Sequence, residues 1–152
     1  MFDVFFGRPV AYAKLIGSDK YPGIMGDAYF YPQKDGSLIS IRVNGLPVSD
    51  EVCGKRFFAL HIHAGSNCTG DDFSNTDGHY NPGSCTHPKH AGDLPPLLGC
   101  GKRAFMALLT DSFEPWDVIG RTIVVHESFD DFISQPAGNS GAKIACGEIK
   151  AM

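Results

Sequence analysis

Short apolar runs, each bounded by turn-forming residues, are the feature of this sequence that most limits its fold. Six runs are rich in β-branched or aromatic residues and a weaker one alternates over 9–15, as is typical of strands. Eighteen Gly and ten Pro punctuate the chain, and only 114–119 allows a turn or two of helix. About seven strands without a long helix predict an all-antiparallel sandwich or barrel. The six stronger runs are 27–31, 37–43, 57–63, 104–109, 121–127 and 143–146.

Size and charge narrow the classes of function. A chain of 152 residues with 43% hydrophobic residues predicts one domain, 1–152, with a real core. The net charge of −4 provides no basic surface for nucleic acid or an anionic membrane. The first fifteen residues hold no apolar run long enough for a signal core or a membrane span. We therefore expect a cytoplasmic protein as the chain stands, or a secreted or periplasmic one if a leader has been removed.

Two long stretches do not fit the strand pattern. Almost forty residues separate His63 from Gly101, and a second connection covers 127–141. Loops of this length in a compact domain are usually functional or disordered. Both are rich in Gly, Asn, Asp, Ser and Pro, so apolar burial alone does not account for the entropy lost when they become ordered. The sequence indicates that something else holds them.

All six histidines and one aspartate form a pattern suited to binding metal ions. His61 and His63 alternate on a predicted strand, so both imidazoles leave the same face of the sheet. Another histidine ends the run 122–125, and four candidates in the first long loop are spaced by 8, 3 and 3 residues. Three imidazoles and a carboxylate suit a closed tetrahedral zinc site, whereas several imidazoles in a flattened arrangement suit copper(II). The other candidates are His79, His87, His90, Asp93 and His126.

Each part of this pattern also has an ordinary explanation. A lone His-x-His on a strand is more often structural or exposed, the loop triplet 87–93 could be solvated, and His126 could be a strand-end histidine. The metal hypothesis is stronger because it uses every histidine of the chain and explains how the first long loop becomes ordered.

Five segments, in this order and spacing, resemble the copper/zinc superoxide dismutase family. The match is close over 57–149 and weaker back to about residue 9. It implies an antiparallel Greek-key β-sandwich or flattened barrel of about eight strands with two long functional loops. The segments are LHIH at 60–63, GHYNP at 78–82, HAGDL at 90–94, IGRTIVVH at 119–126 and GNSGAKIACG at 138–147.

The resemblance also implies a role for each candidate ligand. His79 would bridge two metals as an imidazolate, which is reasonable only with a cation on each ring nitrogen. Asp130, otherwise an ordinary solvated loop residue, would accept hydrogen bonds from His61 and His87 and so fix their rings. The implied copper ligands are His61, His63, His79 and His126, and the implied zinc ligands are His79, His87, His90 and Asp93.

The five cysteines include no C-x-x-C pair, which argues against a cysteine-rich zinc module. The residues alone do not say which of them pair. The resemblance implies a disulfide between Cys68 and Cys146. Cys53, Cys85 and Cys100 have no assigned partner, and Cys85, two residues before His87, could be a spare zinc ligand.

The activity implied by the resemblance is disproportionation of superoxide to oxygen and hydrogen peroxide, with copper and zinc as cofactors. His79 would deliver a proton when its copper bond breaks. The family usually has an arginine where this chain has Lys143, and Ala137 lacks a hydroxyl that many members carry there. A lysine is a more mobile point charge than an arginine, so we expect looser positioning of the anion. From local sequence alone, Lys143 is predicted to be an exposed lysine at the start of the last strand.

A non-enzymatic scaffold and a hydrolytic zinc enzyme are the two alternative functions, and the oligomeric state is left open by the sequence. A non-enzymatic copper-binding or zinc-stabilised scaffold of the same fold would be favoured by a missing ligand or a missing cation, but all the implied ligands are present. A hydrolytic zinc enzyme is disfavoured because three imidazoles and Asp93 would leave zinc no open position. A homodimer is possible, although the C-terminal segment 148–152 carries two charges, and a monomer is not excluded.

Overall fold

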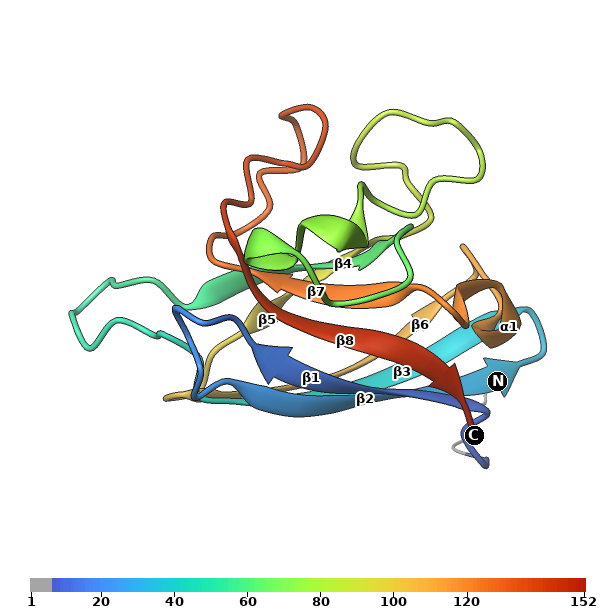
Figure 1. Ribbon diagram of the computed structural model, residues 1–152, viewed down its shortest axis with the longest axis horizontal. Helices are drawn as coiled ribbons and strands as arrows, with labels where there is room; N and C mark the ends of the chain where they lie inside the picture. The colour runs from blue at the N-terminus through green and yellow to red at the C-terminus, as the bar shows by residue number, and fades with distance from the viewer. Residues whose placement is uncertain (1–6) are drawn as a thin grey trace.

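The computed structural model describes residues 7–152, in which eight antiparallel strands form one sheet. The strand order is β5-β4-β7-β8-β1-β2-β3-β6. Because β3 leads to β4 and β6 leads to β7 across the structure, the topology is a Greek key, and the edge strands β5 and β6 approach each other (Figure 1). The strands are β1 (Ala11–Gly17), β2 (Met25–Gln33), β3 (Gly36–Asn44), β4 (Phe57–His63), β5 (Asp93–Leu98), β6 (Arg103–Thr110), β7 (Thr122–His126) and β8 (Lys143–Ala151).

The expected flattened all-β barrel with about eight strands is confirmed. Each of the seven predicted runs coincides with a strand, and the short helix α1 (Pro115–Val118) lies inside the predicted turn of helix at 114–119. Strand β5 was not among the predicted runs, because Pro95 and Pro96 interrupt its strand pattern. Proline is tolerated in a strand at the edge of a sheet, and β5 is an edge strand.

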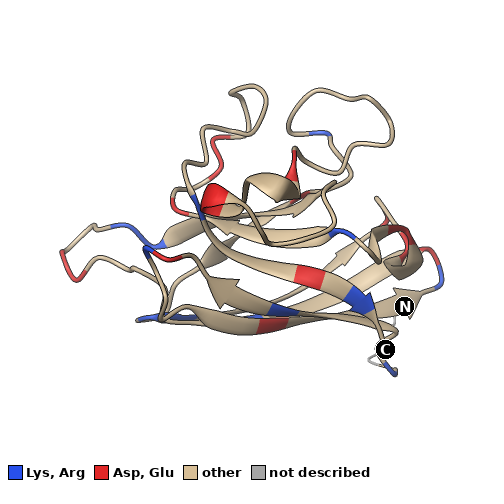
Figure 2. Cartoon of the chain, viewed as in Figure 1, with Lys and Arg blue, Asp and Glu red and all other residues tan. Residues whose placement is uncertain are grey.

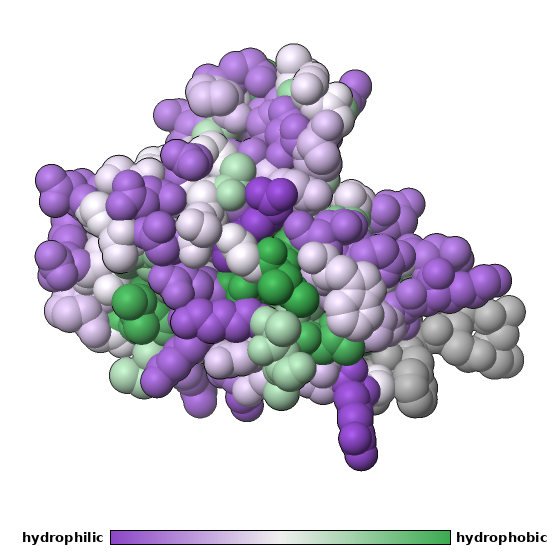
Figure 3. Space-filling model, turned by 45° about the vertical axis from the view of Figure 1, so that its right-hand side comes forward, coloured by the Kyte–Doolittle hydropathy of each residue, from purple (hydrophilic) through white to green (hydrophobic). Residues whose placement is uncertain are grey.

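The core follows from side-chain alternation on the strands. On β1, Ala11, Ala13 and Leu15 are buried while the residues between them face outward. Such alternation places one face of the sheet in the interior. Phe30 and Phe58 are fully buried there, and burial of each phenylalanine contributes about 1.5–3 kcal/mol. Figure 3 shows, on one side of the molecule, an apolar surface patch bordered mostly by polar side chains.

β4 and β7 differ because they are buried on both faces. All five residues of β7 are buried, since loop segments cover the outer face of this part of the barrel (Figure 1). The 3₁₀ helix η1 (Asp71–Thr76) places Phe73 against Val124 and Cys146 in a second, smaller apolar cluster. Because loop segments cover the outer face of β4 and β7, polar side chains that point away from the core on these strands, such as His61 and His126, are also buried.

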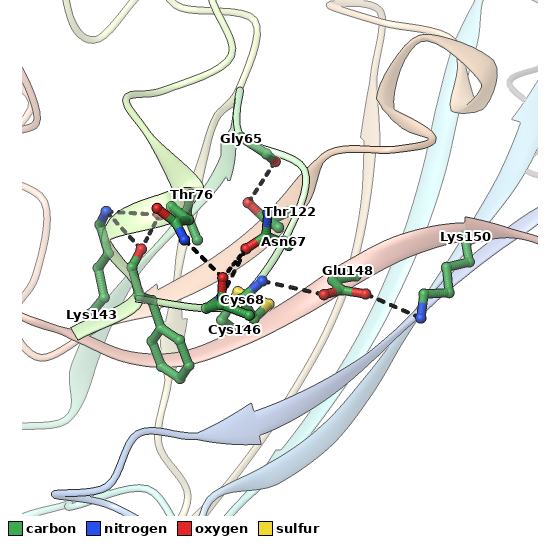
Figure 4. The surroundings of a disulfide bond; sticks show 12 residues. Gly65, Asn67, Cys68, Thr76, Thr122, Lys143, Cys146, Glu148 and Lys150 are labelled. Atoms are coloured by element: carbon green, nitrogen blue, oxygen red, sulfur yellow. Dashed lines mark hydrogen bonds and ion pairs between the residues drawn. A yellow bond between two sulfur atoms is a disulfide. The ribbon is translucent and has the colours of Figure 1, made fainter. Parts of the chain in front are cut away.

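A disulfide joins the first long loop to the last strand. It connects Cys68 to Cys146 over 78 residues of sequence and lies beside η1 (Figure 4). The other three cysteines are free and exposed. None of the helices described within 7–152 has the length and apolarity needed to cross a membrane.

Loss of this disulfide should strongly destabilise the metal-free protein. Cross-linking a loop of 78 residues contributes about 4–5 kcal/mol in the chain-entropy model. Urea denaturation of metal-free Cys68→Ser should therefore show a free energy of unfolding lower by about that amount. Cys85→Ser, at an exposed free thiol, is the control and should change stability by less than about 0.5 kcal/mol. Equal stability of both variants would contradict the prediction.

Candidate metal centre

The candidate ligands come from the covered face of the barrel and from the first long loop. His61 and His63 lie on β4, which pairs with β7, and His126 ends β7. Ile123 and Val125 of β7 point into the core, as do Leu60 and Ile62 of β4. Alternation along each strand therefore places His126 on the same outer face as the two β4 histidines. The loop histidine His79 reaches them through a short antiparallel bridge to His63.

Four imidazoles meet at this face, and we call them the four-histidine group. One ligand atom from each lies within 4.8 Å of the others, and Nε2 of His63 is 3.2 Å from Nε2 of His126. Nδ1 of His61 and Nε2 of His79 are buried and have no hydrogen-bond partner. Buried polar atoms normally have partners, so these two nitrogens fit metal coordination. The group consists of His61, His63, His79 and His126.

A second group, the His/Asp group, lies on the other side of the His79 ring. Nδ1 of His79 is 2.6 Å from Oδ1 of Asp93 and 3.3 Å from Nδ1 of His90. Nδ1 of His87 is 3.1 Å from Oδ2 of Asp93 and is also buried without a hydrogen bond. Three imidazoles and one carboxylate match the donor set of a closed zinc site. The group consists of His79, His87, His90 and Asp93.

His79 therefore belongs to both groups through different nitrogens. Its Nδ1 faces Asp93 and His90, while its buried Nε2 lacks a partner. The rings of His79 and His61 lie with centroids 4.0 Å apart. This is the arrangement that a bridging imidazole requires.

A further layer of hydrogen bonds orients the ligand rings. Asp130, only 3% exposed, accepts from Nε2 of His61 at 2.8 Å and from Nε2 of His87 at 2.9 Å. Nδ1 of His63 donates to the Asp77 carbonyl at 2.8 Å. Each bond occupies one ring nitrogen and leaves the other for a metal, which selects the tautomer. Asp130 thus accepts a hydrogen bond from one histidine of each group.

Burial favours the neutral form of three imidazoles, those of His61, His63 and His126. Desolvation lowers the pKa of His61 and of His63 to about 2 and that of His126 to about 4. Burial also acts to raise the pKa of Asp93, but the hydrogen bond from His79 and its nearby charge outweigh this and lower it. Metal ligands must be neutral imidazoles and ionised carboxylates, so these shifts favour the forms of His61, His63, His126 and Asp93 that bind a metal.

The family model described as copper/zinc superoxide dismutase (SODC) matches residues 24–149. The chain belongs to the copper/zinc superoxide dismutase family. A Cu-Zn superoxide dismutase of Deinococcus radiodurans is 33% identical, over 96% of this chain and 87% of the relative. One from Aquifex aeolicus is 31% identical, over 92% and 86%.

Solved structures of the superoxide dismutase fold agree with this assignment. A superoxide-dismutase-like protein from Bacillus subtilis superimposes with a TM-score of 0.75 at 27% identity, covering 90% of this chain and 96% of that one. The Cu/Zn superoxide dismutase of Brucella abortus has the same fold, with a TM-score of 0.75 at 22% identity over 91% and 98%. The cofactors of this family are copper and zinc, and the two ligand groups fit both.

In this superoxide dismutase family member, a cavity of about 650 Å³ leads to the four-histidine group. His63, His79 and His126 line it together with residues of the loop 127–141. That loop contains no Lys or Arg (Figure 2). Among the described residues that line the cavity, Lys143 is the one lysine or arginine. The lining therefore carries the charge of Lys143 together with the carboxylate of Asp77, and Lys143 is the group in it that can attract an anion.

The Lys143 ammonium has three oxygen atoms around it. Its Nζ donates to Oγ1 of Thr76 at 2.7 Å and lies 3.4 and 3.5 Å from the carbonyl oxygens of Phe73 and Asp77. Figure 4 shows the ammonium directed toward the end of η1. Thr76 is fully buried, and its hydroxyl donates to the Phe73 carbonyl. Three oxygens thus hold the ammonium beside the end of η1. Looser positioning of the anion than by an arginine stays a prediction.

Sequence reasoning missed several residues of the site. Thr76 contacts Lys143 across 67 residues, and Gln135 contacts His87 across 48. Neither belongs to a local motif, so only a three-dimensional arrangement reveals them. The suggestion that Cys85 is a spare zinc ligand gains no support, because Cys85 is exposed and belongs to neither group of candidate ligands found in residues 7–152.

The metal-free protein should lose stability as the pH falls below about 6.5. The lowered pKa values of His61, His63 and His126 mean that the unfolded chain binds more protons than the folded chain below their ordinary value. Stability therefore decreases with falling pH, by at most about 1.4 kcal/mol per pH unit for each imidazole. Urea denaturation after chelation, at pH 7, 6, 5 and 4.5, measures this slope. A free energy of unfolding that stays constant over this range would rule it out.

Proposed function

We propose that this chain is a superoxide dismutase, which converts two superoxide ions and two protons to oxygen and hydrogen peroxide. Copper would be held by the four-histidine group and zinc by the His/Asp group. The single observation that carries the assignment is that His79 presents Nδ1 to one group and a buried, unpartnered Nε2 to the other. A histidine cluster with a purely structural role would have no reason to place one imidazole between two groups of ligands with a buried ring nitrogen left unpartnered.

The chain's own residues account for binding, charge and proton delivery. Copper in the four-histidine group would supply one-electron exchange with superoxide, and zinc would supply a fixed positive charge beside His79. The neutral imidazoles of His61, His63 and His126 are donors compatible with both oxidation states of copper. Nε2 of His79 can hold a proton whenever it is free of metal, and His79 also lines the cavity through which the anion arrives.

The cavity favours an enzyme over a non-enzymatic copper-binding or zinc-stabilised scaffold of the same fold. A scaffold needs no access to its metal, whereas here three of the four histidines line an open cavity that also contains Lys143. Metal content per chain, combined with inhibition of superoxide-driven cytochrome reduction, separates the two. Two metals without inhibition would identify a scaffold.

Substitution of His79 should affect both metal sites at once. His79→Ala removes a donor from each group, so both the visible copper spectrum and zinc retention against a chelator should change. His90→Ala should weaken zinc alone, and His63→Ala should perturb copper alone, since each of these belongs to one group. An effect of His79→Ala on only one metal would contradict the bridge.

Lys143 should control the encounter with superoxide. Lys143→Ala should lower kcat/KM at low ionic strength by about tenfold with both metals bound, Lys143→Glu should lower it further, and added salt should reduce these differences. Burial lowers the pKa of Lys143, so the charge is present below that pKa and lost above it. Activity of the wild type should therefore fall in alkali sooner than that of Lys143→Arg. Equal low-salt rates for wild type, Lys143→Ala and Lys143→Glu would return Lys143 to a structural role.

A further inference from the structure

The side chain of Gln135, in the loop 127–141, forms two hydrogen bonds with the main chain of the candidate zinc ligand His87. Oε1 of Gln135 accepts a hydrogen bond from the His87 main-chain nitrogen at 3.0 Å. Nε2 of Gln135 donates to the His87 carbonyl at 2.7 Å. A single amide thus satisfies both main-chain polar groups of His87, as a paired strand would.

The same loop also holds the His87 ring. Oδ1 of Asp130 accepts from Nε2 of His87 at 2.9 Å, which leaves the unpartnered Nδ1 toward the His/Asp group. The loop backbone packs directly on this hydrogen bond at Gly138, where φ is +65° and an added Cβ would lie 2.7 Å from Nε2 of His87 and overlap Asp130. Main chain and ring of His87 are therefore both fixed by one loop.

The other side of this loop segment forms part of the cavity wall. Gln135, Pro136 and Ala137 line the cavity that leads to the four-histidine group. Gln135 itself is exposed and contributes little apolar burial, so its two hydrogen bonds are its main attachment to the first long loop. A change in the position of His87 can reach the cavity wall through this amide.

We propose that Gln135 is a positioning residue that couples zinc at His87 to the wall of the substrate cavity. Zinc on Nδ1 of His87 fixes the His87 main chain, and the Gln135 amide transfers that constraint to residues 132–138. This inference rests on the proposed function, because it requires zinc in the His/Asp group.

The chain contains a matched local control. Asn81 makes the same kind of bidentate contact with Cys85, accepting from its nitrogen at 2.9 Å and donating to its carbonyl at 2.8 Å. Both residues belong to the first long loop, so this amide stabilises a turn without linking two loops. Removal of the Asn81 amide deletes these two bonds. Removal of the Gln135 amide deletes its two bonds to His87 and a longer one from Nε2 to the Ile133 carbonyl at 3.3 Å. The bond to Ile133 is local and does not depend on zinc, so only the bonds to His87 should affect coupling between the loops.

Hydrogen exchange measured by mass spectrometry tests the coupling. Wild type, Gln135→Met and Asn81→Leu are compared with metals removed and after loading with zinc alone, using peptides that cover 84–92 and 132–138. In the wild type, zinc should slow exchange in both segments. In Gln135→Met, zinc should still protect 84–92, but the zinc-dependent slowing of 132–138 should be about tenfold smaller than in the wild type, because the two hydrogen bonds to His87 are lost. Loss of the local bond to Ile133 would instead speed exchange equally with and without zinc. Asn81→Leu should keep zinc-dependent protection of 132–138.

Gln135→Glu is an intermediate variant, and failure of the coupling can be told apart from failure of the proposed function. Gln135→Glu keeps the acceptor for the His87 nitrogen but loses the donor to its carbonyl, so protection of 132–138 should fall between wild type and Gln135→Met. Full zinc-dependent protection of 132–138 in Gln135→Met would overturn the coupling while leaving the metal assignment intact. Failure of the wild type to retain one zinc per chain would instead refute the proposed function.

Discussion

Buried imidazole nitrogens without hydrogen-bond partners are the constraint on which this structure depends. Nδ1 of His61, Nε2 of His79 and Nδ1 of His87 are all in this state. Each would cost about 1–3 kcal/mol if nothing replaced its lost hydration. Their convergence toward two groups of donors shows that the fold is organised around cations. The barrel supplies the rigid part of that organisation, because β4 and β7 pair directly and carry three of the histidines.

A disulfide, a small apolar cluster and a few hydrogen bonds hold the two long loops in place. The disulfide fixes Cys68 to β8, and Phe73 of η1 packs over Val124 and Cys146. Asp130 and Gln135 hold His87 from the second loop. One of these contacts is covalent, one is a small apolar cluster and the others are hydrogen bonds. Together they do not require the large apolar area that glycine-rich and asparagine-rich loops lack. The same contacts bring the walls of the cavity together.

Tertiary contacts determine where the charge of Lys143 lies in the cavity. A lysine has three donors on a flexible stem, and its side chain alone predicts a mobile charge. In this protein the oxygens of Phe73, Thr76 and Asp77 surround Nζ of Lys143. The Asp77 carbonyl also accepts from Nδ1 of His63. The cation and a candidate copper ligand are thus positioned by the same turn.

Sequence alone determined the class of fold and the candidate ligands. Short apolar runs bounded by turn residues identified seven of the eight strands, since this composition is a local property of the sequence. The ligand hypothesis came from the use of every histidine in one spacing pattern, and the family resemblance assigned them to two metals. Only the tertiary structure placed β5, whose prolines obscure its pattern but are tolerated at a sheet edge. It also decided the contacts of Thr76 with Lys143 and of Gln135 with His87. These contacts join residues 67 and 48 positions apart, and no local periodicity encodes an interaction that forms only when distant loops meet.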